Sequence, residues 1–121
     1  MKKILITEDS PTMRSLLIST IEALDGFEIV EAASGFEALR LLPRDRIDLI
    51  ITDINMPDIN GLELISYVRN NPVYRDIPLF IITTESSEKD REKGLALGAD
   101  EYLTKPFDPL KLQELITRYL G

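Results

Sequence analysis

Short apolar runs alternate five times along the chain with longer segments in which apolar residues recur every three or four positions. The short runs are typical of buried strands, and the periodic segments are typical of helices with one face in the core. The predicted strands cover residues 3–7, 27–31, 47–52, 79–83 and 102–104. The third and fourth are almost continuously apolar, which indicates central strands, whereas the alternation in the second is typical of a sheet edge.

Capping residues and prolines mark the ends of the predicted helices. Ser34 to Glu37 form a capping box, and Ser10 and Asp108 each precede a proline at the start of a helix. The predicted helices cover residues 10–24, 34–43, 60–71, 87–97 and 108–119. The first helix is expected to bury one face, formed by Met13, Leu16, Leu17, Ile21 and Leu24. The last is expected to bury another, formed by Leu112, Leu115, Ile116 and Tyr119.

The alternation of strands and helices, without any hairpin signal, predicts an α/β domain with a parallel sheet and right-handed crossovers. A chain of 121 residues is long enough for one domain with a core and too short for two. No linker, repeat or low-complexity tract interrupts it, so residues 1–121 are expected to form one domain. Ligands of open parallel sheets bind at the carboxyl ends of the strands. The residues directly after the strands are therefore the candidates for function.

Composition narrows the possible chemistry. The net charge of −7 argues against a nucleic-acid partner, because binding phosphates requires clustered Lys and Arg. The chain has no cysteine and no histidine, which excludes disulfides, thiolate sites and the usual general base. Any phosphohistidine in the function must belong to another molecule. The first apolar run ends at Thr7, too soon for a signal peptide, and no run is long enough to span a membrane. We therefore expect a cytoplasmic protein.

Acidic residues follow two of the predicted strands. Glu8 and Asp9 come after the first strand, and Asp53 comes after the third. Three converging carboxylates repel one another unless a cation or protons compensate. Oxygen ligands without histidine or cysteine favour a hard ion, and Mg2+ before a transition metal. The pattern thus predicts an Mg2+ site at this end of the sheet.

The same end of the sheet carries the groups needed for phosphoryl transfer. Asp53 can act as a nucleophile and form an aspartyl phosphate. Lys105, after the fifth strand, and Mg2+ would neutralise the charge that develops on the transferred group. The hydroxyl of Thr83, at the end of the fourth strand, can donate a hydrogen bond to the product.

Together these residues resemble the motifs of response-regulator receiver domains of two-component signalling, of the kind found in chemotaxis response regulators. The resemblance covers the whole chain. The matching residues are Glu8 and Asp9, the stretch Asp53-Ile54-Asn55-Met56-Pro57 with Gly61 and Glu63 after it, Ile82 and Thr83, and Lys105-Pro106-Phe107.

The resemblance implies a doubly wound, flavodoxin-like (βα)5 fold with a five-stranded parallel sheet in the order 2-1-3-4-5. It implies that Glu8, Asp9 and Asp53 bind Mg2+ together with the backbone carbonyl of Asn55. Asp53 matches the phosphoacceptor and Lys105 the lysine that binds the phosphoryl group. The peptide bond between Lys105 and Pro106 is expected to be cis, as it is in family members.

Further positions match residues that transmit and time the signal in this family. Thr83 and Tyr102 match a pair of switch residues, in which the tyrosine is expected to swing into space that the threonine vacates. Asn55, Thr84 and Glu85 match positions that tune access of water to the phosphoryl group. Polar Asn55 and Glu85 resemble short-lived members, while Thr84 stands where many members carry Ala or Gly and is expected to crowd the site.

The implied function is a phosphorylation-activated switch with self-phosphorylating and self-dephosphorylating activity, not a turnover enzyme. The phosphoryl donor would be a sensor histidine kinase or a histidine phosphotransfer protein. The output surface is expected on the fourth helix, fifth strand and fifth helix, for docking a downstream protein or for homodimerisation. Residues 86–93 are almost entirely polar and Gly94 follows, so only Leu95, Ala96 and Leu97 offer clustered apolar contacts on the fourth helix. The sequence does not name the kinase or the output, or show whether the natural chain continues past Gly121.

Other functions are considered beside this one. A phosphatase of the haloacid-dehalogenase type needs a second aspartate two residues after the nucleophile, where this chain has Asn55. A flavodoxin-like FMN carrier needs a phosphate-binding loop after the first strand, where Glu8 and Asp9 would repel a phosphate. A receiver without chemistry, acting as a static scaffold, is disfavoured because every active position is filled.

Each candidate residue also has a purely structural interpretation. Asp9 can be a helix cap, and Thr83 an ordinary strand-end residue. Tyr102 can be a half-buried aromatic residue of a sheet edge, and Lys105 a solvated surface charge. The charges at 88–93 are interpreted as a solvated helix face.

Overall fold

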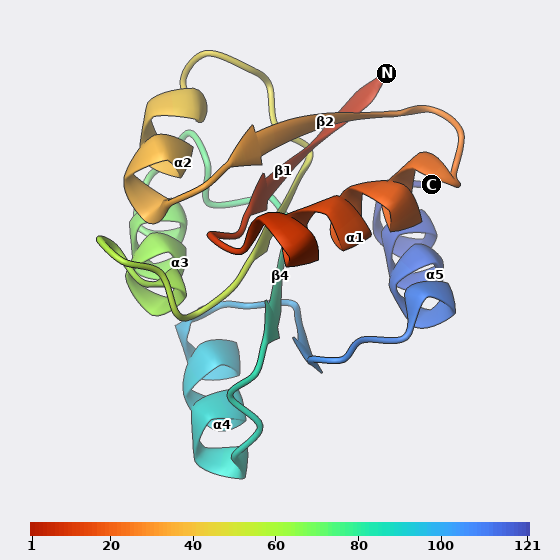
Figure 1. Cartoon of the computed structure of the whole chain (residues 1–121). Helices are drawn as coiled ribbons and strands as arrows, with labels where there is room; N and C mark the ends of the chain where they lie inside the picture. The colour runs from red at the N-terminus through yellow and green to blue at the C-terminus, as the bar shows by residue number, and fades with distance from the viewer.

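The computed structural model describes residues 1–121 and contains one parallel sheet of five strands (Figure 1). The strands run in the order β2-β1-β3-β4-β5, as expected. Their bounds are β1 Lys2–Thr7, β2 Phe27–Ala32, β3 Leu49–Thr52, β4 Leu79–Thr83 and β5 Glu101–Thr104. The predicted α/β class, the strand order and the edge position of β2 are confirmed.

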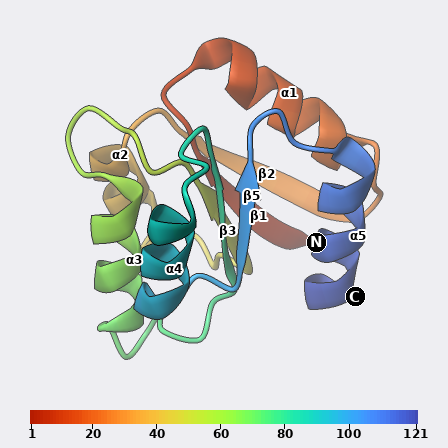
Figure 2. The same ribbon diagram turned by 90° about the horizontal axis from the view of Figure 1, so that it is seen from below.

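Five helices connect the strands and cover both faces of the sheet. Their bounds are α1 Pro11–Glu22, α2 Gly35–Leu41, α3 Gly61–Arg69, α4 Glu88–Leu97 and α5 Pro109–Leu120. Helices α1 and α5 lie on one face, and α2, α3 and α4 lie on the other (Figure 2). None of these helices has the length and apolar character needed to cross a membrane.

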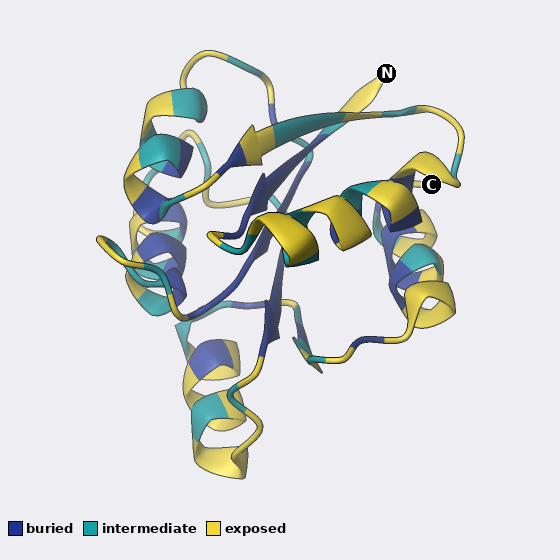
Figure 3. Ribbon diagram, in the orientation of Figure 1, coloured by how far each residue is buried: buried dark blue, intermediate teal, exposed yellow.

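Alternating residues of the central strands divide the core into two layers. In β1, Ile4 and Ile6 pack toward α1 and α5, and Leu5 packs toward α2 and α3. The strands β1, β3 and β4 are buried almost throughout, as Figure 3 shows. Because residues on both faces of these strands are covered by helices, their sequences are continuously apolar.

Two details of the predicted elements are wrong. Leu16 is 45% exposed, so the buried side of α1 is narrower than the periodicity indicated and centres on Leu17 and Ile21. Strand β3 begins at Leu49 and not at Ile47. Asp48, just before it, contacts Lys3 through both its backbone N–H and its side chain. The carboxylate of Asp48 accepts a hydrogen bond from the backbone N–H of Lys3 at 2.8 Å.

Helix α4 has the fewest buried residues of the five, and its contact with the core differs from our expectation. Gly94 is its one buried residue, while Leu95 and Ala96 are exposed. A Cβ atom at position 94 would lie 2.8 Å from Cδ1 of Ile81, so the glycine lets the helix approach the sheet closely. Of the expected apolar residues only Leu97 is half-buried and packs against the core, which supports the view that this helix is lightly anchored.

The chain passes from β1 outward to β2 and then back across β1 to β3. The strand order therefore reverses between β1 and β3, and the loops that follow these two strands diverge there. A crevice at such a reversal is where ligands of doubly wound sheets bind. The fold places Glu8, Asp9 and Asp53 at this point.

Candidate functional site

Three carboxylates meet at the carboxyl ends of β1 and β3. Glu8 and Asp9 follow β1 directly, and Asp53 follows β3. One oxygen from each carboxylate lies within 4.8 Å of the others. Glu8 and Asp53 are buried, whereas Asp9 is exposed. The structure therefore brings together the three acidic residues that the sequence singled out.

Lys105, the first residue after β5, supplies a cation to this cluster. Its Nζ lies 2.6 Å from Oε1 of Glu8 and 2.7 Å from Oδ2 of Asp53. Burial alone lowers the pKa of Lys105, but hydrogen bonds to Asp53 and Glu8 outweigh burial and leave the pKa raised. The peptide bond between Lys105 and Pro106 is cis, the geometry that the resemblance implied. One ammonium group faces three carboxylates, so the cluster has excess negative charge that a divalent cation can neutralise.

The two acids after β1 have different surroundings. Glu8 is 2% exposed, and burial raises its pKa more than the hydrogen bonds from Lys105 and Ser10 lower it. Its Oε2 accepts a hydrogen bond from the backbone N–H of Ser10 at 3.1 Å. Asp9 makes no side-chain hydrogen bond; the cap of α1 is Ser10, whose hydroxyl accepts from Met13 N–H. Asp9 is thus the most available ligand of the three.

Backbone groups hold the carboxylate of Asp53 in place. Its Oδ1 accepts hydrogen bonds from the N–H groups of Ile54 at 2.6 Å and Asn55 at 3.3 Å. The first turn of α3 approaches the carbonyl of Asp53 at Gly61, where a side chain would collide with that carbonyl. The Gly61 N–H also donates to the carbonyl of Ile54 at 2.8 Å. A glycine is therefore required where α3 begins against the backbone of the candidate nucleophile.

Arg14 in α1 also belongs to the site, although the sequence did not single it out. One terminal nitrogen of its guanidinium donates to the carbonyl of Glu8 at 2.7 Å. Its Nε lies 3.2 Å from Oε1 of Glu31 in β2. A single polar residue in an amphipathic helix gives no signal of this role, because both partners lie on other elements.

Asp58 is a second residue that the sequence analysis missed. Its carboxylate accepts hydrogen bonds from the N–H groups of Gly35 at 3.2 Å and Phe36 at 3.1 Å, at the start of α2. Hydrogen bonds from Ile59 and Phe36 hold the pKa of Asp58 below its usual value. Asp58 therefore ties the loop after β3, which carries Asn55, to α2.

The expected switch residues, Thr83 and Tyr102, lie beside this site. Thr83, the last residue of β4, is fully buried; its Oγ1 accepts from Glu85 N–H at 3.3 Å and makes no hydrogen bond to Asp53. Tyr102 is 6% exposed, and its hydroxyl donates to the carbonyl of Glu85 at 2.6 Å. The ring is therefore buried in this structure, and its movement on phosphorylation stays a prediction. Gly94 leaves the space for the ring, since a Cβ there would lie 3.2 Å from it.

The three residues expected to tune water access surround the strand ends. Nδ2 of Asn55 donates to Oε1 of Glu85 at 2.8 Å, so the loops after β3 and β4 are joined there by their side chains. Thr84 lies between Thr83 and Glu85 and is exposed. Their effect on water remains a prediction.

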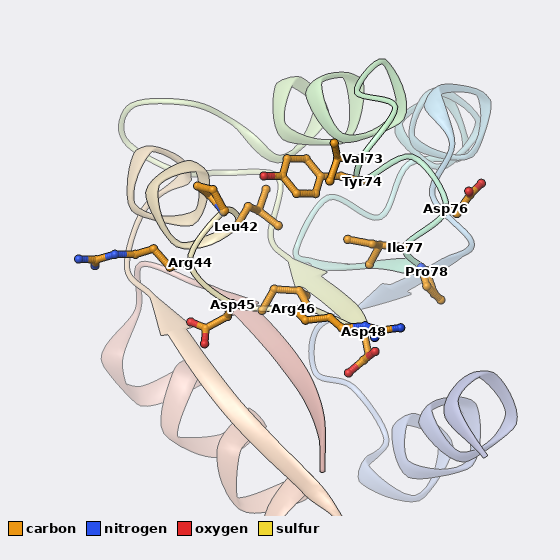
Figure 4. Close-up of a pocket in the computed structure, with 12 residues that line it drawn as sticks. Leu42, Arg44, Asp45, Arg46, Asp48, Val73, Tyr74, Asp76, Ile77 and Pro78 are labelled. Carbon is orange, nitrogen blue, oxygen red and sulfur yellow. The ribbon is translucent and has the colours of Figure 1, made fainter.

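A hollow in the molecule lies away from this site. It has a volume of about 640 Å³ and is lined by residues 42–48, 73, 74 and 76–78, which precede β3 and β4 (Figure 4). This is the opposite end of the sheet from the acidic cluster, and none of the predicted site residues lines it. The candidate functional site is therefore indicated by charge and topology, and not by this hollow.

Comparison with known families agrees with this geometry. The family model for the response regulator receiver domain matches residues 4–117 of the 121. The chain belongs to the response regulator receiver family. Receiver domains act in two-component signalling as switches and not as turnover enzymes, and they interact with sensor histidine kinases and downstream targets.

Several relatives place this receiver near the chemotaxis regulators. It is 38% identical over 120 residues to a chemotaxis protein CheY homolog of Campylobacter jejuni, covering 98% of this chain and 92% of the relative. Its structure is similar to that of the chemotaxis response regulator CheY4 of Vibrio cholerae, with a TM-score of 0.89, 38% identity and 99% of each chain covered. This receiver is therefore CheY-like, with the flavodoxin-like fold.

A third similarity bears on the metal. The receiver domain of a Pseudomonas aeruginosa sensor histidine kinase, with a magnesium ion coordinated in its active-site cleft, is 30% identical. The TM-score is 0.89, with 99% of this chain and 98% of the other covered. The receiver family binds Mg2+ in its acidic site, and the donors of this chain suit that ion. They are three convergent carboxylates, in a chain without the cysteine or histidine that transition metals prefer.

Proposed function

We propose that residues 1–121 form a phosphorylation-activated switch in which Asp53 accepts a phosphoryl group in an Mg2+-dependent reaction. The observation that carries this proposal is the convergence of Glu8, Asp9 and Asp53 with Lys105 at the reversal in strand order. Three carboxylates whose oxygens lie within 4.8 Å of one another, two of them buried, carry an electrostatic cost. A bound divalent cation removes that cost.

The chemistry is the transfer of a phosphoryl group to a carboxylate. An oxygen of Asp53 forms a bond to phosphorus while the bond from phosphorus to the donor breaks, and the donor leaves with the electron pair. Hydrogen bonds from Ile54 and Asn55 to Oδ1 fix the direction of the carboxylate before the reaction. Lys105 can exchange its contact with Asp53 for a contact with a phosphoryl oxygen and neutralise its charge.

The metal would be held by Glu8, Asp9 and Asp53, with the backbone carbonyl of Asn55 as a further ligand. When bound, Mg2+ supplies positive charge to the phosphoryl oxygens during transfer. Hydrolysis of the aspartyl phosphate by water would reset the switch, so the chain would catalyse both its own phosphorylation and its own dephosphorylation. The phosphoryl donor in the cell would be a phosphohistidine of a sensor histidine kinase or of a histidine phosphotransfer protein. This chain has no histidine, so the phosphohistidine must belong to that partner.

Phosphorylation would change the surface formed by α4, β5 and α5, where a downstream protein or a second copy of this chain would bind. Helix α4 is suited to move, because Gly94 is its one buried residue. Its N-terminal half is joined to β5 by a hydrogen bond from Arg91 to the carbonyl of Tyr102 at 3.2 Å. The main chain of Glu85 bonds to both Thr83 and Tyr102, so a shift of Thr83 toward a phosphoryl group reaches β5 through this residue. The cytoplasmic location stays a prediction.

Backbone NMR with beryllofluoride, a phosphoryl mimic, tests the switch. With Mg2+ present, we expect amide shift changes near Asp53 and also in residues 86–94, in β5 and in α5. Changes confined to the loops around Asp53, Thr83 and Lys105 would contradict the proposed output surface. Asp53→Asn is the control, since it should show no change on adding beryllofluoride.

The lifetime of the phosphorylated form depends on Asn55, Thr84 and Glu85. Polar Asn55 and Glu85 leave room for water, so we expect the aspartyl phosphate to decay without an added phosphatase within a day at neutral pH. If Thr84 slows that decay by crowding, Thr84→Ala should shorten the lifetime. The decay is followed by intact-protein mass spectrometry after the phosphodonor is removed. A phosphoprotein that stays intact for a day would show that crowding dominates.

A further inference from the structure

Arg14 is joined to the acidic site through the backbone and not through a carboxylate. Its guanidinium donates to the carbonyl of Glu8 at 2.7 Å, while its Nε pairs with Glu31 at 3.2 Å. Its side chain is 20% exposed, so the contact with Glu8 is partly shielded from water. Arg14 thus spans from α1 to the turn after β1 and on to β2.

The carbonyl of Glu8 belongs to the peptide unit that links Glu8 to Asp9. A peptide unit is planar, so fixing its oxygen fixes the plane and the directions in which both flanking residues begin. Glu8 is also held by its N–H, which donates to the carbonyl of Ala32 at 3.0 Å, and by its pairing with Lys105. Asp9 has no such restraint on its side chain. The direction of its carboxylate depends on the backbone that Arg14 holds.

We propose that Arg14 is a positioning residue for the metal site, and that it orients Asp9 toward the ion by fixing the peptide unit between Glu8 and Asp9. This inference rests on the proposed Mg2+ site. Partners that orient metal ligands from outside the coordination shell typically change metal affinity by about 10- to 100-fold. Arg14 has the geometry of such a partner.

This inference is testable, because simple charge repulsion predicts the opposite change in Mg2+ affinity when Arg14 is removed. Arg14 places a cation beside a site for Mg2+, and a cation there repels the ion. If electrostatics dominated, removing Arg14 would strengthen Mg2+ binding. The pairing with Glu31 offsets much of that repulsion, because the ion pair of Arg14 and Glu31 has no net charge. Positioning therefore dominates, and removing Arg14 should weaken binding.

The experiment is isothermal titration of the full chain with Mg2+ in the absence of phosphodonor. Arg14→Met should bind Mg2+ about tenfold more weakly than wild type. Arg14→Lys keeps the charge but loses the planar group that reaches both partners, so it should bind as weakly as Arg14→Met. Glu31→Gln should weaken binding by a smaller factor, because it leaves the cation uncompensated. Arg44→Met, which removes a cation at the opposite end of the sheet, should leave binding unchanged.

The free energy of unfolding in urea without metal is measured for each variant, to separate positioning from loss of folding. The role of Arg14 is overturned if Arg14→Met is folded and binds Mg2+ as tightly as wild type or more tightly. Should Arg14→Met fail to fold, Arg14→Lys decides by the same comparison. A wild-type chain that does not bind Mg2+ overturns the proposed function, and this inference with it. If wild type binds Mg2+ and Arg14→Met binds it more weakly, both the proposed function and this inference are supported.

Discussion

Replacing Asp9 by alanine should weaken Mg2+ binding by more than the roughly 10- to 100-fold that loss of an orienting partner costs. Asp9 is exposed and makes no side-chain hydrogen bond, so its carboxylate is free to bind an ion without breaking an existing contact. Glu8 and Asp53 must share their oxygens with Lys105. Loss of Asp9 therefore removes the ligand whose carboxylate makes no hydrogen bond within the protein.

The stability of the metal-free protein should not fall in Asp9→Ala. Without metal, Asp9 adds a third negative charge to a cluster that holds one ammonium group. Its removal relieves repulsion, so the free energy of unfolding in metal-free urea titrations should be unchanged or raised. Asp76→Ala, at the opposite end of the sheet, is the matched control and should change neither quantity. Equal Mg2+ affinity in wild type and Asp9→Ala would contradict the assignment of Asp9.

Much of the site could be predicted because its residues follow buried strands. Strands are recognised from local apolar runs, and the carboxyl ends of parallel strands meet at one edge. Asp53 and Lys105 are far apart in sequence, yet the alternation of strands and helices was enough to place them together. Their contact at 2.7 Å is a consequence of topology.

The residues that were missed act through pairs that no local pattern reveals. Arg14 contacts Glu8 and Glu31, and Asp58 contacts the first residues of α2. In the sequence each of these is one more charged residue between apolar positions. Their roles depend on the packing of α1 against β1 and of the loop after β3 against α2, which is a property of the folded chain.

The errors have the same origin. Periodicity marks Leu16 as apolar but does not give the width of the surface that α1 buries, and Leu16 lies outside it. In α4 the apolar cluster Leu95, Ala96 and Leu97 was expected to make the contact. Leu95 and Ala96 are exposed, and the contact is made by Gly94 and Leu97. The same glycine leaves room for the buried ring of Tyr102.

Replacing Asp53 by asparagine should abolish phosphorylation while leaving the fold intact. An amide is not a nucleophile toward phosphorus under conditions in which a carboxylate is, so no acyl phosphate can form. Asparagine has nearly the same shape and keeps an oxygen that can accept hydrogen bonds from Ile54 and Asn55. Circular dichroism and urea unfolding should therefore show a folded domain.

Intact-protein mass spectrometry after incubation with acetyl phosphate tests the phosphoacceptor assignment most directly. With Mg2+, wild type should gain the mass of one phosphoryl group, and with a chelator in place of Mg2+ it should gain none. Asp53→Asn should gain none under either condition. Full labelling of Asp53→Asn would contradict the account, because the phosphoryl group would then reside on another residue.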